Sequence, residues 1–195
     1  MDYGVGNLFS IKCALEKAGF KTVIGLQDSA LKRADIFILP GVGDFSTASK
    51  NLTLIREKLI EASEAGTEIF GICLGMQLLL EESKEGDGRG LELIKGLNVE
   101  LPASVKVPHM GWNTIRIVNK NRLLEGLNNE SYFYFAHSYY PVPEEKYIVC
   151  AETTYGVTFA SVVAKKNIFG VQFHPEKSGK NGLKLLGNLL DIVKR

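Results

Sequence analysis

A cysteine between two glycines most strongly limits the folds this chain can adopt. A buried strand is predicted over 68–72, where Ile69 and Phe70 form an apolar run. Cys73 follows this strand, and a helix is predicted over 76–82. Glycines at 71 and 75 allow the backbone to turn sharply from strand into helix, which leaves the side chain between them exposed at the turn. The same turn with serine in place of cysteine is typical of α/β hydrolases. The pattern therefore predicts a strand–turn–helix unit with a nucleophilic thiol at its apex.

Predicted strands and helices alternate in the first half of the chain. The expected elements are a helix over 8–18 closed by Gly19, strands over 21–25 and 35–40, and a long helix over 48–62 that stops near Gly66. Such alternation indicates βαβ units and a parallel sheet.

The pattern changes after a glycine-rich loop at 86–90. The second half is expected to form mixed or antiparallel strands and a last helix, with strands over 106–107, 114–118, 132–136, 147–152, 157–164 and 168–172 and the helix over 180–193. The 195 residues are enough for one well-cored domain, so we expect a single α/β domain over 1–195.

Composition excludes several classes of function. The net charge is +1, so no strong field attracts nucleic acid or an anionic membrane. No apolar run approaches the roughly 20 residues that span a bilayer. The three cysteines are widely spaced and form no CxxC pair, which argues against a disulfide framework and a zinc site. We expect a cytoplasmic protein with no metal or organic cofactor.

A nucleophilic thiol needs a base and a group that orients the base. His174 follows an apolar strand, and Pro175 biases it toward an extended backbone. Glu176 would then lie on the same side of the chain and could accept a hydrogen bond from the imidazole. Cys73, His174 and Glu176 therefore form a candidate catalytic triad.

The remaining cysteines and histidines favour structural roles. Cys13 and Cys150 sit inside periodic or alternating runs and are expected in the core. His109 and His137 have no carboxylate beside them and are expected to anchor loops or to lie on a binding surface.

Acyl chemistry also needs hydrogen-bond donors for the developing oxyanion. The backbone N–H of Leu74 follows the nucleophile directly and is a candidate. The turn at 40–43 (Pro-Gly-Val-Gly) is the best candidate for a second donor, because its glycines allow a peptide to turn inward.

Several motifs together resemble a known family. Residues 71–77 (Gly-Ile-Cys-Leu-Gly-Met-Gln), 40–43 and 174–176 (His-Pro-Glu) are similar to class I, triad-type glutamine amidotransferases. The match narrows to the glutaminase subunits of imidazole glycerol phosphate synthases through four further stretches, 2–8 (Asp-Tyr-Gly-Val-Gly-Asn-Leu), 108–113 (Pro-His-Met-Gly-Trp-Asn), 137–139 (His-Ser-Tyr) and 172–178 (Gln-Phe-His-Pro-Glu-Lys-Ser). The resemblance covers essentially the whole chain.

The resemblance implies a mechanism and a set of site residues. Cys73 would attack the glutamine side-chain amide to form a γ-glutamyl thioester, with His174 moving protons and Glu176 orienting it. Oxyanion donors would be the backbone N–H groups of Val42 and Leu74. Glutamine would be held by Gly43, Gln77, Glu85, Ser138 and Tyr139.

The resemblance also implies a partner, a (β/α)8-barrel cyclase subunit in a heterodimer. Ammonia would be channelled to it and used to make imidazole glycerol phosphate and aminoimidazole carboxamide ribotide in histidine biosynthesis. Positions facing the partner would be Asn7, Ser10, Trp112 and Lys177.

The implied fold is a single-domain, three-layer α/β structure. A mixed, mostly parallel central sheet would carry helices on both faces, with a smaller antiparallel sheet beside it. In this family a short apolar strand precedes the motif at 2–8, whereas here only Met1 precedes Asp2. The first strand is therefore expected to be truncated.

Three other functions stay open at this point. One is the glutaminase subunit of a different synthase, such as pyridoxal phosphate synthase. Another is a cysteine hydrolase that works without a partner, and the third is a non-enzymatic interaction protein with the same fold.

Overall fold

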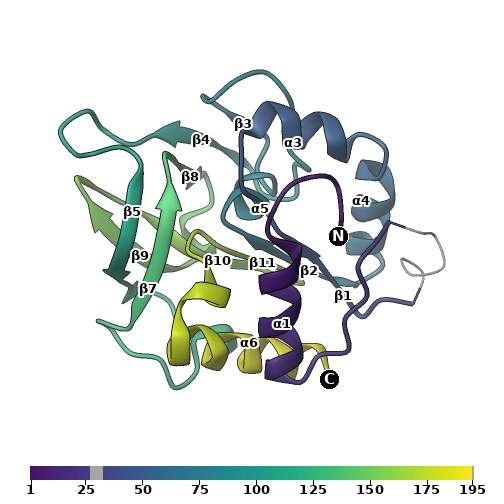
Figure 1. Ribbon diagram of the computed structural model, residues 1–195. Coiled ribbons are helices and arrows are strands. Elements are labelled where there is room, and N and C mark those ends of the chain that lie inside the picture. The colour runs from purple at the N-terminus through teal and green to yellow at the C-terminus, as the bar shows by residue number, and fades with distance from the viewer. Residues whose placement is uncertain (27–32, 195) are drawn as a thin grey trace.

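Six strands form a central sheet, described here from a computed structural model that places residues 1–26 and 33–194 (Figure 1). Its order is β1-β2-β11-β10-β9-β6. These strands span Ile36–Leu39 (β1), Glu68–Ile72 (β2), Arg116–Ile117 (β6), Val149–Tyr155 (β9), Val157–Lys165 (β10) and Ile168–Val171 (β11). β2 pairs in parallel with β1 and β11, whereas the pairings from β11 through β10 and β9 to β6 are antiparallel. The sheet is mixed, as expected, but its parallel part is smaller than the resemblance implied.

Two smaller sheets stand beside the central one. The first has the order β3-β4-β8, with β3 at Glu82–Ser83, β4 at Gly96–Glu100 and β8 at Tyr139–Pro143. The second is an antiparallel pair of β5 (His109–Thr114) and β7 (Tyr132–His137). Sequence patterns missed β3, β4, β5 and β8. Residues 106–107, expected to form a strand, are not in one and lie just before β5.

Helices cover both faces of the central sheet. They are α1 (Leu8–Ala18), α3 (Phe45–Leu52), α4 (Arg56–Glu64), α5 (Leu74–Gln77) and α6 (Gly179–Val193), with 3-10 turns η1 (Arg122–Leu124), η2 (Lys146–Ile148) and η3 (Pro175–Lys177). Figure 1 shows α1 and α6 side by side, and α3 and α4 on the other side of the sheet. Among the described residues, no helix is both long and apolar enough to cross a membrane.

Alternation along the strands divides the apolar core in two. Phe37 and Ile69 pack with the α3 and α4 side, whereas Phe70 and Ile72 pack with α1 and α6. Successive side chains of a strand point to opposite faces, so each central strand contributes to both cores. This gives the three-layer arrangement of the expected fold.

Other expected elements also differ from the structure. Residues 21–25, all described, contain no strand, and Val23 there is 77% exposed. The helix expected over 48–62 is two helices, α3 and α4. Its break follows Thr53, whose hydroxyl bonds back to the Ser49 carbonyl, an interaction that competes with helix continuation.

The helix after the cysteine is also shorter than predicted. α5 ends at Gln77 because the next carbonyls bond to a neighbouring loop. Leu91 donates its backbone N–H to the Leu78 carbonyl (2.6 Å), and Ile94 donates to Leu79 (3.0 Å). With these acceptors occupied, the helical pattern is not extended.

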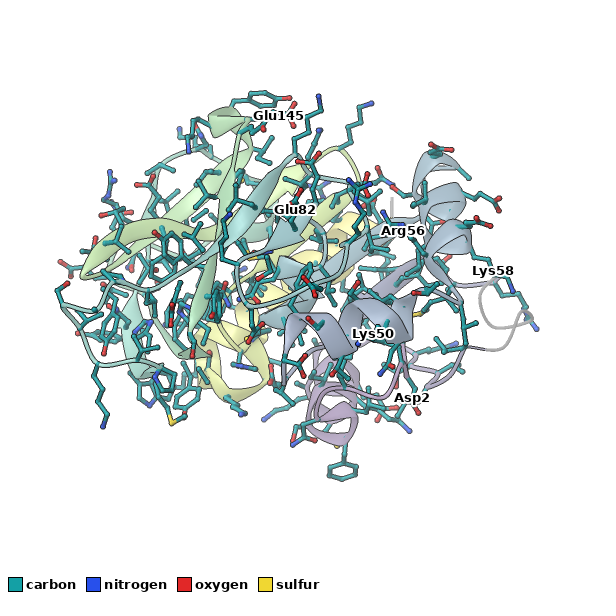
Figure 2. All side chains as sticks on the ribbon, turned by 90° about the horizontal axis from the view of Figure 1, so that it is seen from above. Asp2, Lys50, Arg56, Lys58, Glu82 and Glu145 are labelled. Atoms are coloured by element: carbon teal, nitrogen blue, oxygen red, sulfur yellow. The ribbon has the colours of Figure 1, made fainter. Side chains whose placement is uncertain are left out.

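Charged side chains lie mainly around the outside of this core. Figure 2 shows Lys58 on the outward side of α4 and Glu145 at the periphery of the molecule. The N-terminal amino group of Met1 instead donates to the Ile38 carbonyl of β1 (2.9 Å).

Candidate active site

The ends of two neighbouring parallel strands bring the predicted triad to one place. β2 leads into Cys73, and β11, which pairs with β2, leads through Gln172 and Phe173 into His174. The Cys73 N–H donates to the Val171 carbonyl (2.8 Å), so the cysteine backbone is still tied to β11. Residues about 100 positions apart in the sequence therefore meet because their strands are hydrogen-bonded.

The turn at Cys73 is strained, and close backbone packing holds it. Cys73 has φ 55° and ψ −111°, a backbone region that residues with a side chain rarely adopt. A Cβ on Gly75 would overlap the Leu39 carbonyl oxygen of β1. The glycine is therefore required by the approach of α5 to the sheet, which supports the reading of 71–75 as a sharp turn.

Glu176 holds His174 in a buried hydrogen bond. The imidazole Nδ1 lies 2.8 Å from Glu176 Oε1, and both side chains are nearly inaccessible, at 3% and 2% exposure. The backbone is fixed as well, because the His174 N–H donates to the Tyr134 carbonyl (2.8 Å) and the Ser178 hydroxyl donates to the His174 carbonyl (2.6 Å).

The electrostatics of this pair favour a charged imidazole. Burial lowers the pKa of His174, but interactions with Cys73 and Glu176 outweigh the burial and raise the pKa to about 10. A protonated imidazole beside a thiol stabilises the thiolate, which is the reactive form of cysteine.

The thiol and the imidazole are not hydrogen-bonded to each other. The Cys73 Sγ donates to the Ala136 carbonyl (3.6 Å), and the buried His174 Nε2 makes no hydrogen bond among the described residues. Hydrogen bonds between catalytic groups commonly tighten only when substrate binds. The unpartnered Nε2 is the atom available to exchange a proton with the sulfur.

A cleft of about 170 Å³ opens at Cys73. Its walls contain both predicted oxyanion residues and all five predicted glutamine-binding residues. The expected residues along it are Val42, Gly43, Cys73, Leu74, Gln77, Glu85, Ser138 and Tyr139. His174 and Glu176 are not among the residues that line the cleft.

Glu85 is the carboxylate of the cleft. Its Oε2 accepts the backbone N–H of Phe45 (2.8 Å), which fixes the side chain at the start of α3. Burial raises the pKa of Glu85, the Phe45 N–H opposes this rise, and the nearby Asp44 adds to it. A ligand ammonium group would restore the preference for the charged carboxylate.

Four residues of the cleft were not among the predicted catalytic, oxyanion or glutamine-binding residues. They are Pro108, Met110, Ala136 and His137, all from the β5–β7 pair and the residue before it. Pairing of β5 with β7 would have pointed to them, but no local pattern predicted β5. His109 and His137 are buried at 3% and 5% exposure and lie on strands β5 and β7, and His137 lines the cleft, which agrees with the expectation of a binding-surface residue.

The N-terminal loop supports the turn at 40–43. Tyr3 is 3% exposed, and its hydroxyl donates to the Pro40 carbonyl. Gly6 approaches the Pro40 side chain so closely that an added Cβ would lie 3.1 Å from it. The motif at 2–8 therefore positions the turn that carries Val42.

The predicted interface residues lie on adjoining elements. Asn7 caps α1 by accepting the Ser10 N–H (3.1 Å), and α1 packs against η3, which carries Lys177. The Lys177 ammonium lies 5.6 Å from the Tyr134 ring of β7, and Trp112 of β5 makes an edge contact with the same ring. Trp112 is 56% exposed, so it is not a core tryptophan.

The other cysteines divide between surface and core. Cys150 is buried, as expected, and burial raises its pKa to about 11. Cys13 is exposed, so its predicted core position was wrong. The buried residues of α1 are Ile11 and Leu15, and Cys13 lies on another side of the helix. In the part of the chain that the structure describes, no three His, Cys, Asp or Glu side chains gather closely enough to hold a metal ion.

Comparison with known proteins gives a consistent result. A sequence model of the family described as glutamine amidotransferase class-I matches residues 1–191. A protein of Methanocaldococcus jannaschii named imidazole glycerol phosphate synthase subunit HisH is 46% identical over 99% of this chain and 98% of its own. The proteins of the same name from Archaeoglobus fulgidus and Natronomonas pharaonis are 47% and 45% identical, covering 100% and 98% of this chain and 98% and 92% of theirs.

Solved structures share the fold at lower identity. A structure described as PurLQS from Thermotoga maritima aligns with a TM-score of 0.76 at 24% identity, covering 97% of this chain and 95% of that one. A crystal structure described as a glutamine amidotransferase aligns at 0.73 with 20% identity, covering 98% and 96%.

Proposed function

Because this chain belongs to the class I glutamine amidotransferase family, we propose that it is the glutaminase subunit of an imidazole glycerol phosphate synthase. The observation that carries this is the meeting of Cys73, His174 and Glu176 at the ends of β2 and β11, beside a cleft that holds the expected substrate residues. The reaction is hydrolysis of glutamine to glutamate and ammonia.

In the proposed first half-reaction, the Cys73 thiolate attacks the side-chain amide carbon of glutamine. The negative charge that develops on the amide oxygen is stabilised by the backbone N–H groups of Leu74 and Val42. The His174 imidazolium gives its proton to the departing nitrogen, so ammonia leaves and a γ-glutamyl thioester forms on Cys73.

In the second half-reaction, neutral His174 removes a proton from water. The water oxygen attacks the thioester carbon, glutamate departs, and the sulfur returns to the thiolate beside a protonated His174. Glu176 keeps the imidazole oriented and favours its charged form in both steps.

Glutamine recognition uses the polar groups of the cleft. Glu85 pairs with the ammonium group of the substrate glutamine. The backbone around Gly43, Ser138 and Tyr139 binds the carboxylate and main-chain atoms of the glutamine. The Gln77 amide nitrogen already donates to Tyr139 O (2.7 Å) and to Gln172 Oε1 (3.2 Å), so its oxygen is the atom left for substrate.

The proposed partner is a (β/α)8-barrel cyclase subunit that receives ammonia directly. Free ammonia would be protonated and lost in bulk water, so a docked acceptor site preserves its reactivity. The surface formed by Asn7, Ser10, Trp112 and Lys177 would face the barrel. An exposed tryptophan held against a tyrosine is typical of an interface anchor.

The test of this function is glutamate release from glutamine, with and without the cyclase and its nucleotide ligand. We expect low activity alone and high activity in the liganded complex. Cys73→Ala should lose at least about 10⁴-fold. Equal turnover with and without the cyclase would instead support a partner-independent hydrolase, and a pull-down with pyridoxal phosphate synthase would test the other synthase.

Partner binding has its own test. Trp112→Ala should weaken binding of the cyclase by about 2 kcal/mol, roughly 30-fold in Kd, without changing the melting temperature. Tyr147 is a matched control, because it is 70% exposed and lies on η2, which carries none of the proposed interface residues. Equal losses for Trp112→Ala and Tyr147→Ala would contradict this interface.

A further inference from the structure

We propose that Gln172 is a positioning residue for the nucleophile and that its side-chain N–H holds the Cys73 sulfur. This inference rests on the proposed role of Cys73. Gln172 is completely buried, and its Nε2 lies 3.7 Å from Cys73 Sγ. Its Oε1 accepts a hydrogen bond from Gln77 Nε2 (3.2 Å). A buried amide is costly unless its polar atoms are paired, and here the sulfur is the partner of the amide nitrogen.

The orientation of the Gln172 amide follows from the groups around it. The Tyr139 carbonyl can only accept, so the atom of Gln77 that faces it (2.7 Å) must be the amide nitrogen. That nitrogen also faces Gln172, which must therefore present its oxygen to Gln77. The Gln172 nitrogen is left to face the sulfur of Cys73.

Two buried histidines complete the chain of hydrogen bonds. His137 Nδ1 lies 2.9 Å from the same Tyr139 carbonyl, so this nitrogen carries a proton. His137 Nε2 lies 3.0 Å from His109 Nδ1, and His109 Nε2 lies 3.3 Å from Asn113 Nδ2. With both imidazoles neutral, each contact pairs one donor with one acceptor. The Tyr139 carbonyl is thereby fixed from the β5–β7 side.

The chemical consequence concerns the thiolate. An N–H directed at the sulfur stabilises its anionic form more than its neutral form, because a hydrogen bond to a charged group is stronger. The opposite amide orientation would place an oxygen against the thiolate and destabilise it. The network behind Gln172 thus keeps the favourable end of the amide at the nucleophile.

The test is the pH dependence of Cys73 alkylation by iodoacetamide, with the modified peptide identified by mass because Cys13 is also exposed. Other titratable groups that act on the thiol are His174, with Glu176 behind it, and Tyr3. All of them are unchanged in the variants described below.

Gln172→Met removes the donor and keeps a side chain of similar length. We expect the alkylation midpoint to rise by about one pH unit, a tenfold lower rate at pH values below the midpoint. Gln77→Met frees the Gln172 amide to rotate and should raise the midpoint by a smaller amount. It provides the measurement if Gln172→Met does not fold.

Asn188→Leu is the matched control. Asn188 is also a buried amide, and it donates to the carbonyls of Leu123 (3.0 Å) and Glu125 (2.8 Å), away from the cleft. We expect a lower melting temperature and an unchanged midpoint.

An unchanged midpoint in folded Gln172→Met, or in Gln77→Met where the former does not fold, would overturn the proposal. An equal shift in Asn188→Leu would also overturn it. Alkylation requires no glutamine, so failure of the glutaminase assay is a separate result.

Discussion

Two buried histidine clusters in this molecule have opposite electrostatics. His174, after β11, pairs with the Glu176 carboxylate, and its pKa is raised to about 10. His137, on β7, pairs with a carbonyl oxygen and with His109, and burial lowers its pKa to about 3. Both side chains are almost fully buried, so burial alone does not explain the difference.

The difference lies in the groups that surround each imidazole. His174 interacts with the Cys73 sulfur and the Glu176 carboxylate, whose negative charge compensates the imidazolium, whereas the carbonyl and the neutral imidazole beside His137 supply only dipoles. His109 follows the same rule, since burial lowers its pKa to about 4 and its neighbours are an amide, an imidazole and aromatic rings. One site can therefore hold a proton for chemistry, while the other stays neutral and serves as a rigid scaffold.

The largest effect is expected when the His174 site loses its carboxylate and thereby resembles the His137 site. Glu176→Gln removes the carboxylate charge but keeps the shape, so the pKa of His174 should fall below its present value of about 10. Glutaminase activity in the complex should drop by about 10²- to 10⁴-fold. Glutamate release and NMR titration of His174 measure the two effects. Glu145→Gln, a carboxylate paired with Lys165 at the periphery, should leave both unchanged.

A second substitution tests the backbone turn at Cys73 while leaving the His174–Glu176 pair unchanged. Gly75→Ala places a Cβ against the Leu39 carbonyl oxygen and should destabilise the protein by about 3 kcal/mol. Gly187→Ala, on α6 with open space around it, should be neutral or slightly stabilising. Thermal unfolding of both variants measures this, and similar stabilities would contradict the close packing at the elbow.

A smaller effect, on the pH dependence of stability, is expected from the neutral pair His109 and His137. The pKa values of His109 and His137 are lowered below their ordinary value of 6.5, so their contribution to stability is present above pH 6.5 and is lost as the pH falls toward 4 and 3. His109→Phe keeps a ring between Phe135 and Tyr155 but cannot be protonated. It should make the melting temperature less sensitive to pH between 6.5 and 4, and an unchanged acid limb would refute the assignment.

The smallest expected effect lies on the alkaline side. The pKa of His174 is raised above 6.5, so its contribution to stability is complete below pH 6.5 and is lost as the pH rises toward about 10. Glu176→Gln should flatten this alkaline limb of the melting temperature, whereas His109→Phe should not. Identical alkaline limbs in wild type and Glu176→Gln would show that the carboxylate does not hold the proton.

Local sequence patterns correctly predicted the helices and strands that depend on residues close together in the chain. α1, β1, β2 and α6 appear where periodicity and punctuation placed them, and Gly19 ends α1 with φ 104° as a left-handed cap. Elements that depend on distant partners were not predicted. β5 is irregular in its polar pattern and is a strand because β7 pairs with it, while residues 21–25 have a strand-like pattern but are not in a strand.

The sequence by itself determined the chemical groups of the site, because a nucleophile between glycines and a histidine two residues before a glutamate are local signals. It also determined the family, through motifs spread along the whole chain. Only the tertiary structure decided that His109 and His137 are buried and neutral and that the Gln172 amide faces the sulfur. The reason is physical: a pKa and an amide orientation depend on the groups that pack around a side chain, and those groups come from strands that are distant in the sequence.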